Sequence, residues 1–441
     1  MMEMLRSIRF WLLLAAWICA FVQVVTFARV EAIGNIGFAI FALYLLLTLP
    51  FLRRDSILIV GFIVMLGLFF IRAVPDMETI MGAGRFVLIF AGLVPTMALV
   101  KSTALTMPSV RLSQNALANL PPEASSAGLQ LAGHAFGGVI NTGTFAMLSA
   151  ALPQDSSFER RKLAAMAALR GMNGSAMWSP FFVAFAIGQS FNGAGAAWSA
   201  IGYGILVALL FTAISLPVFT PGLTLSIVKT SLNCLRPVMF RLLVVLFSVL
   251  GVALAFGLTA LSAVVATMPV LVLIQIIRRS QFTGTILSDT RQSMRSMADD
   301  LVVISAAMIL GWLVTRTGAI SIILEFLPAE TFPGWFALIS TPVVMMLGSV
   351  VGIHPVITAT VLLSLFSGSG SSSNPSLLMS SHLIGWAAGT MSSIASLSVI
   401  TCTTLYRVPG RDLALGVNMV TALLLALGGG SLLAVINAAF Y

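Results

Sequence analysis

The chain has 441 residues, of which 59% are hydrophobic and only 8% are charged. A soluble domain of this length needs a solvated surface rich in charged side chains, and 14 acidic residues are too few to provide one. The net charge of +9 does not indicate nucleic-acid binding, because the basic residues fall in short segments between apolar stretches, a pattern typical of topology signals.

Apolar stretches of roughly 20 residues recur along the chain, and each is long enough to cross a bilayer as a helix. We therefore expect an all-α polytopic membrane protein with about eleven transmembrane helices. The first stretch has no obvious small-residue cleavage site, so we interpret it as a retained helix and not as a signal peptide. The predicted spans are 10–27, 34–52, 56–74, 84–101, 162–190, 196–217, 241–259, 261–277, 299–316, 377–404 and 412–438.

Two further apolar stretches, 125–153 and 334–366, are too long for one simple span. Gly, Asn, Thr, His and Pro residues interrupt both of them near the middle, where they would break a continuous helix. We interpret these stretches as re-entrant hairpins, each of which returns to the side of the membrane from which it entered.

The distribution of Lys and Arg supports this arrangement. The basic groups predicted to be cytoplasmic are Arg6 and Arg9, Arg53 and Arg54, Lys101 and Arg111, Arg160 to Lys162, Lys229 to Arg241, Arg278 to Arg295, and Arg407 and Arg411. A single crossing by either hairpin would place every later group on the wrong side. We expect a multi-pass inner (plasma) membrane protein with a cytoplasmic N-terminus, a periplasmic or extracellular C-terminus, and periplasmic loops at 325–333 and 367–375.

Three pairs of segments match at a separation of roughly 214 residues and in the same order. They are Leu99–Ala104 with Val314–Ala319, the segment from Val139 with that from Ile353, and the segment from Gly171 with that from Gly385. The predicted organisation is an extra N-terminal helix (1–33) and two inverted repeats (34–220 and 221–441). Each repeat holds scaffold helices, one hairpin (125–153 or 334–366) and one interrupted helix (162–190 or 377–404). Inverted repeats are typical of secondary transporters.

The tip of the first hairpin, Ile140–Thr144, contains an Asn-Thr pair, and the tip of the second is His354–Thr358. With the repeat pattern from Gly34 to Ala438, the chain resembles the ion transporter superfamily of elevator-type carriers. That group includes divalent anion/sodium symporters, citrate carriers, arsenite-type exporters and sodium/proton antiporters. Its sodium/dicarboxylate branch has Ser-Asn-Thr at both hairpin tips, which the second tip here lacks. The resemblance implies an elevator mechanism, coupling to sodium or protons, and a homodimer.

Polar and small residues mark a candidate substrate site at membrane depth, where irregular backbone is tolerated only beside protein or water. They lie at the hairpin tips and at Asn173-Gly174-Ser175 and Gly389–Ser393, where we place the helix breaks; close helix packing at small residues is the alternative. The candidate substrate-binding residues are Asn141, Thr142, Thr144, Arg170, Asn173, Ser175, His354, Thr358, Thr390, Ser392 and Ser393. Oxygens of Asn141, Thr142, Ser175 and Thr358 are alternative ligands for a coupling sodium ion.

The sign of the substrate charge follows from helix ends. We expect the second half of each interrupted helix to begin near Ser175 or Ser392, and each returning hairpin arm near Thr142 or Thr358. Four N-termini would then converge and favour an anion. Arg170 either faces this cavity or reaches the cytoplasmic edge. No metal site is expected.

His134, His354 and His382 are candidates for proton relay, with His354 the best placed, or are packing residues. Asp299 and Asp300 suit a solvated helix start.

We predict a secondary active transporter (a symporter is one form) of a small organic or inorganic anion, with no cofactor beyond the coupling ion. Its partners would be the anionic substrate, the lipid bilayer and a second copy of the chain. The hairpins and interrupted helices would move against a scaffold of 34–74, 196–217, 241–277 and 412–438. An alternative is the membrane subunit of a binding-protein-dependent carrier, since such subunits share this superfamily. An intramembrane enzyme is disfavoured by the absence of G-x-S-x-G, H-E-x-x-H and P-loop motifs.

Overall fold

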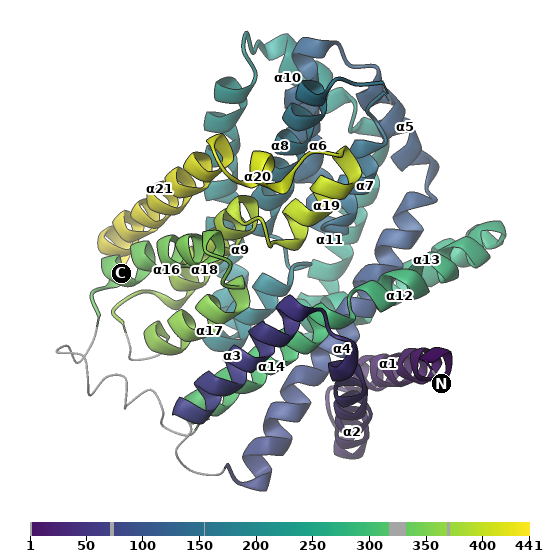
Figure 1. Cartoon of the computed structure of the whole chain (residues 1–441), viewed down its shortest axis with the longest axis vertical. Helices are drawn as coiled ribbons and strands as arrows, with labels where there is room; N and C mark the ends of the chain where they lie inside the picture. The colour runs from purple at the N-terminus through teal and green to yellow at the C-terminus, as the bar shows by residue number, and fades with distance from the viewer. Residues whose placement is uncertain (1, 71–74, 154, 317–331, 368–370) are drawn as a thin grey trace. The chain divides into compact units, whose positions relative to one another are not determined.

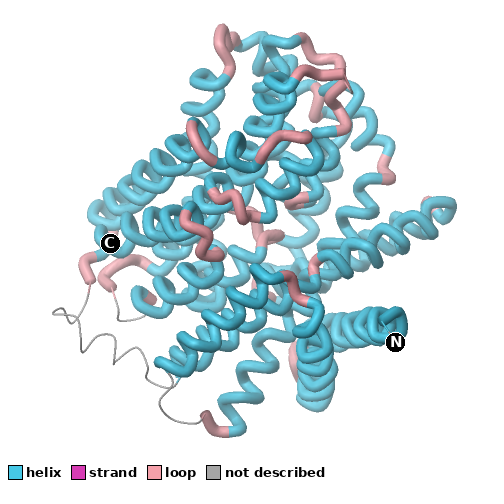
Figure 2. The backbone as a smooth tube through the Cα atoms, viewed as in Figure 1, coloured by secondary structure: helices cyan, strands magenta, loops and turns pink. Residues whose placement is uncertain are grey.

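A computed structural model describes residues 2–70, 75–153, 155–316, 332–367 and 371–441. Every named element in these ranges is a helix, as Figures 1 and 2 show. The predicted class, an all-α polytopic membrane protein, is confirmed. Most of the predicted periplasmic loop at 325–333 and part of that at 367–375 lie outside the described residues, as does half of the segment matched at 314–319.

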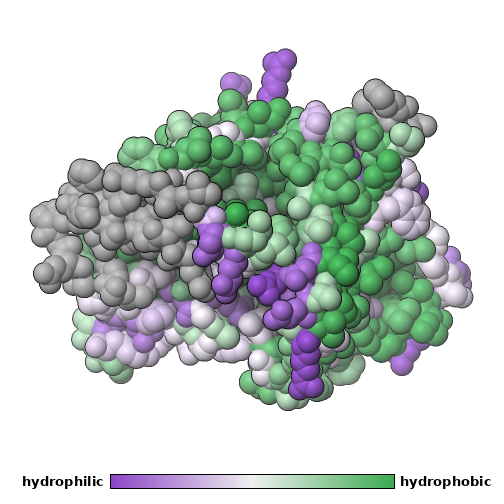
Figure 3. Space-filling model, turned by 90° about the horizontal axis from the view of Figure 1, so that it is seen from below, coloured by the Kyte–Doolittle hydropathy of each residue, from purple (hydrophilic) through white to green (hydrophobic). Residues whose placement is uncertain are grey.

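Among the described residues, eight helices are long and apolar enough to cross a membrane, or nine if the bent pair Ser280–Ser296 and Ala298–Leu313 is one span. The prediction of about eleven spans was larger because it counted α3 (Arg54–Phe70) and α8 (Phe158–Ala176). The apolar part of α3 is only Ser56–Phe69, and α8 begins with a charged turn. Hydrophobic side chains cover much of the face shown in Figure 3.

The chain forms two compact units. Unit 1 comprises residues 1–103 and 248–330, and unit 2 comprises 104–247 and 331–441. Each unit therefore draws on both predicted halves of the chain. The chain passes from one unit to the other within α4 (Met77–Leu105) and α11 (Arg236–Phe256).

Unit 1 is built around pairs of apolar helices. It contains α1 (Met2–Val25), α2 (Glu31–Thr48), η1 (Leu49–Phe51), α3, most of α4, α12 (Ala260–Arg278), η2 (Ser280–Phe282), α13 (Thr283–Ser296) and α14 (Ala298–Arg316). Leu13, Ala16 and Ala20 are buried at helical spacing on α1, which packs against α2 and α12. Helix α13 was not predicted, because its polar composition suggested a loop.

Charged residues from three segments meet at one end of unit 1. Arg53 Nε donates to Asp299 Oδ2 at 2.9 Å, and the guanidinium of Arg291 lies 4.9 Å from the Phe10 ring centroid. Asp299 also accepts from Ser56 Oγ at 3.0 Å. The start of α1, the α2–α3 connection and the α13–α14 connection therefore share one end of this unit.

Unit 2 contains both predicted hairpin ranges, and each is a helix–turn–helix. In the first, α6 (Pro122–Ile140) turns at Asn141, with φ 55°, into the short α7 (Gly143–Ser149). In the second, α16 (Gly334–Val350) turns through Gly352, with φ 91°, into α17 (Pro355–Phe366). The two arms of each hairpin pack against each other. Their re-entry into a membrane stays a prediction.

Both predicted interrupted helices are broken, the first after the predicted segment and the second from Ser393, the last residue of the predicted segment Gly389–Ser393. Helix α8 ends at Ala176 and α9 runs over Val183–Phe219, with a kink at Gly193 (φ 83°). Helix α18 (Pro375–Ser392) is followed by α19 (Leu397–Tyr406). Unit 2 is completed by α5 (Pro108–Ala118), α10 (Leu225–Asn233), α20 (Gly410–Ala414) and α21 (Val417–Phe440).

Close helix crossings hold the core of unit 2 together. A Cβ on Gly171 of α8 would lie 2.1 Å from the carbonyl oxygen of Gln130 in α6, and one on Gly385 of α18 would lie 2.8 Å from Pro342 Cα in α16. Only glycine permits these approaches. Helix α21 packs against α16 and α18, and α9 packs against α18. The predicted scaffold segments 196–217 and 412–438 therefore belong to the same compact unit as the hairpins.

Candidate functional site

The two interrupted helices meet at their breaks. Thr390, in the last turn of α18, donates from Oγ1 to Asn173 Oδ1 in α8 at 2.7 Å. Asn173 is 2% exposed, and its Nδ2 donates to the Leu169 carbonyl at 2.9 Å. Residues 217 positions apart are thus joined by a part-buried hydrogen bond between the two predicted break segments.

The serine hydroxyls of the site are turned toward their own helices. Ser175 Oγ donates to the Met172 carbonyl at 2.6 Å, and Ser392 Oγ donates to the Ala388 carbonyl at 2.8 Å. Ser393 is buried, and its carbonyl accepts from the backbone N–H of Ser396. In this conformation the oxygens of Ser175 and Ser392 are left to act only as acceptors.

The positions of the helix ends revise the electrostatic argument. Ser175 and Ser392 lie at the C-terminal ends of α8 and α18, where carbonyl groups carry partial negative charge. The following halves begin later, at Val183 and Leu397, because proline at Pro180 and an N-cap at Ser396 set those starts. The expectation that they begin near Ser175 and Ser392 was wrong.

The tip of the first hairpin carries backbone strain. Asn141 adopts φ 55° and ψ −136°, and its Oδ1 accepts from the N–H of Thr142 at 2.7 Å. Thr144 Oγ1 is buried and has no hydrogen-bond partner among the described residues. The following helix, α7, packs against α8 and α19, which brings this arm to both interrupted helices.

The tip of the second hairpin is capped by a histidine. His354 Nδ1 accepts from the N–H of Val356 at 3.2 Å, and Thr358 Oγ1 donates to the Pro355 carbonyl at 3.1 Å. The ring of His354 lies edge-on to Trp386 of α18, at 6.3 Å between centroids. Helix α17 begins at Pro355 and packs against α18 and α9. The returning arm thus starts three residues before Thr358.

The other two histidines make local contacts that fit the packing interpretation. Trp178 Nε1 donates to His134 Nε2 at 3.2 Å, and His382 Nε2 lies 2.9 Å from the Ala184 carbonyl. Within the ranges that the structure describes, no group of three or more His, Cys, Asp or Glu residues is arranged to hold a metal ion.

Arg170 is buried away from the break contact, with 2% of its surface exposed. Its Nε donates to Gln130 Oε1 at 3.3 Å, its Nη1 donates to Asn418 Oδ1 at 3.1 Å, and its guanidinium stacks 3.9 Å from the Phe219 ring centroid. All three partners are uncharged, and among the described residues Arg170 forms no ion pair. Arg170 does not reach the surface, and its side-chain partners do not include Asn173.

Several buried polar side chains were not predicted as site residues. Both side-chain atoms of Gln189 in α9 lack a hydrogen-bond partner among the described residues, and so do the hydroxyls of Thr360 and Ser364 in α17 and Thr403 in α19. Helix α17 packs against α9, and α7 packs against α19. Buried polar groups without partners are suited to a bound ligand or ordered water. Of these residues, only Gln189 has a signal in the sequence, because a glutamine is unusual within an apolar stretch.

No family model matches the sequence, and neither does any curated protein. Among solved structures, the chain is similar to a crystal structure of the YdaH transporter of Alcanivorax borkumensis, which is described as having an unusual topology. The identity is 15%, the TM-score is 0.54, and the match covers 88% of this chain and 99% of that one. At this identity the likeness shows a shared fold, that of a polytopic helical membrane protein.

Proposed function

We propose that this chain is a secondary active transporter of a small anion. The observation that carries the proposal is the hydrogen bond between Thr390 and Asn173, which joins the breaks of two interrupted helices inside one compact unit. Broken helices free backbone groups, and in a membrane protein such groups are tolerated where they line a binding cavity. The similarity to a transporter structure supports the same conclusion.

The charge of the proposed substrate follows from what surrounds the breaks. The sequence has no Asp or Glu between residues 160 and 288 or between 331 and 411, so no carboxylate from these segments can bind a cation. Arg170 lies one turn from Asn173 and is held by neutral partners only. An uncompensated guanidinium in a low-dielectric interior attracts an anion. Arg170 would act through its field and not as a direct ligand.

The proposed ligands are the polar groups of the tips and breaks. Asn141, Thr144 and Asn173 contribute from the first half of the chain and His354 from the second, while the one hydroxyl hydrogen of Thr390 is donated to Asn173. The buried, unpartnered amide of Gln189 extends the set. The oxygens of Thr142, Ser175 and Thr358 remain candidates for a coupling sodium ion, which prefers such neutral oxygens when no fixed carboxylate is present.

Alternating access would arise from movement of unit 2 as one body. The order helix–turn–helix, broken helix and closing helix occurs in both halves of unit 2, as inverted repeats require. Because α9 and α21 pack with the hairpin helices, the proposed moving unit includes them, and unit 1 provides the scaffold. This is an elevator mechanism with a larger moving body than the sequence had indicated.

A thermal-shift screen of the purified protein tests the substrate class. Carboxylates, sulfonates and inorganic oxyanions would be added in sodium chloride and in choline chloride. We expect at least one anion to raise the melting temperature of the wild-type protein and not that of Asn173→Ala. Gly202→Ala is the matched control, because a Cβ there meets nothing within 4 Å. Stabilisation by cations or neutral solutes alone, or equal stabilisation of Asn173→Ala, would contradict the proposal.

A further inference from the structure

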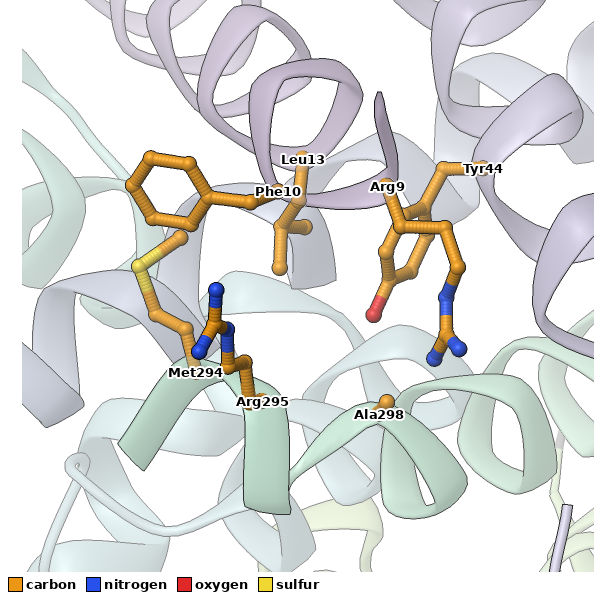
Figure 4. A pocket seen from close by; sticks show the side chains of 7 residues that line it. All are labelled: Arg9, Phe10, Leu13, Tyr44, Met294, Arg295 and Ala298. Carbon is orange, nitrogen blue, oxygen red and sulfur yellow. The ribbon is translucent and has the colours of Figure 1, made fainter. Parts of the chain in front are cut away.

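Unit 1 contains a cavity of about 250 Å³ where α1, α2, α13 and the start of α14 come together. In Figure 4, Arg9 and Arg295 lie on either side of the Tyr44 hydroxyl. The lining residues are Arg9, Phe10, Leu13, Tyr44, Met294, Arg295 and Ala298. The cavity thus combines two guanidinium groups and a phenol with apolar side chains.

The lining of the cavity is positively charged and includes no acid. The adjacent carboxylate of Asp299 accepts hydrogen bonds from Arg53 Nε at 2.9 Å and Ser56 Oγ at 3.0 Å, so it is already engaged. Arg9 Nε is buried and has no hydrogen-bond partner in the part of the chain that the structure describes. Two guanidinium groups with an unsatisfied donor match the oxygens of a phosphate group.

The surroundings of the cavity favour a lipid over a soluble anion. Helix α1 carries exposed apolar side chains next to it: Met4 is 61% exposed, Ile8 38% and Trp11 60%. Tryptophan is typical of the membrane–water interface. Helix α13 buries Ile286, Thr290 and Met294 on one side, while its arginines are exposed, as in helices that lie along that interface.

We propose that this cavity binds the phosphate of an anionic phospholipid between Arg9 and Arg295, with an acyl chain lying along the exposed apolar side of α1. The bound lipid would come from the leaflet at this end of unit 1. The site is independent of the proposed transport site, since it uses no residue of unit 2.

The test measures binding of short-chain dioctanoyl phosphatidylglycerol to the full-length protein in a neutral detergent, by microscale thermophoresis. Dioctanoyl phosphatidylcholine, glycerol 3-phosphate and inorganic phosphate are the comparison probes. The variants are Arg295→Gln, Arg9→Gln and the double variant. Arg29→Gln is the matched control, because that arginine lies beyond the other end of α1.

We expect saturable binding of the phosphatidylglycerol and at least tenfold weaker binding of the phosphatidylcholine. Each arginine removed should weaken phosphatidylglycerol binding about fivefold, as basic residues do at an anionic membrane surface, and Arg29→Gln should have no effect. Unchanged binding in Arg295→Gln, whose exposed side chain is not needed for folding, would overturn the proposal. Equal affinity for both lipids would do so too. Inorganic phosphate binding as tightly as phosphatidylglycerol would show a site for free anions instead.

Discussion

Replacing Thr390 with valine removes the hydroxyl that joins the two interrupted helices while keeping the shape of the side chain. The 2.7 Å hydrogen bond to Asn173 is lost, and Asn173 Oδ1 is left unpartnered in a residue that is 2% exposed. A buried acceptor without a partner costs about 1–3 kcal/mol, so we expect destabilisation in that range. Thr390→Ser keeps the donor and should recover most of the loss.

A double-mutant cycle with Asn173→Ala isolates the contact between the two side chains. We expect a coupling free energy of about 0.5–1.5 kcal/mol, the net contribution of one hydrogen bond. The free energy of unfolding is measured in mixed micelles by raising the mole fraction of a denaturing detergent, with tryptophan fluorescence as the signal. A coupling near zero, or Thr390→Val with wild-type stability, would refute the conclusion that the breaks of α8 and α18 are joined here.

Three further predictions test other parts of the fold. Gly171→Ala places a Cβ 2.1 Å from the Gln130 carbonyl oxygen and should destabilise the protein by about 1–3 kcal/mol. The control Gly202→Ala should be neutral or slightly stabilising. Equal melting temperatures of the two variants would count against the α6–α8 crossing. Asp299→Asn should destabilise by only about 1 kcal/mol in chemical denaturation, because the Arg53 side chain is 61% exposed. Single cysteines in the predicted cytoplasmic segments 111–123 and 155–162, in a cysteine-free background, should react with an impermeant thiol reagent only after permeabilisation. Labelling in intact cells would exclude the hairpin topology.

Features set by local sequence were predicted well. Apolar runs between basic loops predicted the helices. Gly and Asn near the middle of the hairpin stretches predicted both turns, because these residues adopt the positive φ that the turns require. The sequence also contains a signal for the late start of α9. Ser179-Pro180 is typical of a turn, and in the structure Ser179 Oγ accepts from the Phe181 N–H at 3.2 Å. The prediction placed the break of the first interrupted helix at Asn173-Gly174-Ser175, just before this turn.

Features that depend on distant contacts were not predictable. The surroundings of Arg170 include Asn418, which is 248 residues away, so sequence position alone left its environment open. The grouping of α21 with the hairpin helices depends on how it packs against α16 and α18. Gln189 is visible in the sequence as a polar residue in an apolar stretch, but the lack of a hydrogen-bond partner for its amide among the described residues depends on its neighbours in the fold.

Uptake into proteoliposomes tests the central claim, transport of an anion through the site where α8 and α18 meet. Vesicles containing the purified protein would receive the radiolabelled anion identified by thermal shift, under an imposed sodium or proton gradient. The account predicts accumulation above the equilibrium level with wild-type protein and with Gly202→Ala, and none with Asn173→Ala. Failure of wild-type protein to accumulate any stabilising anion under either gradient, or undiminished uptake by Asn173→Ala, would contradict it.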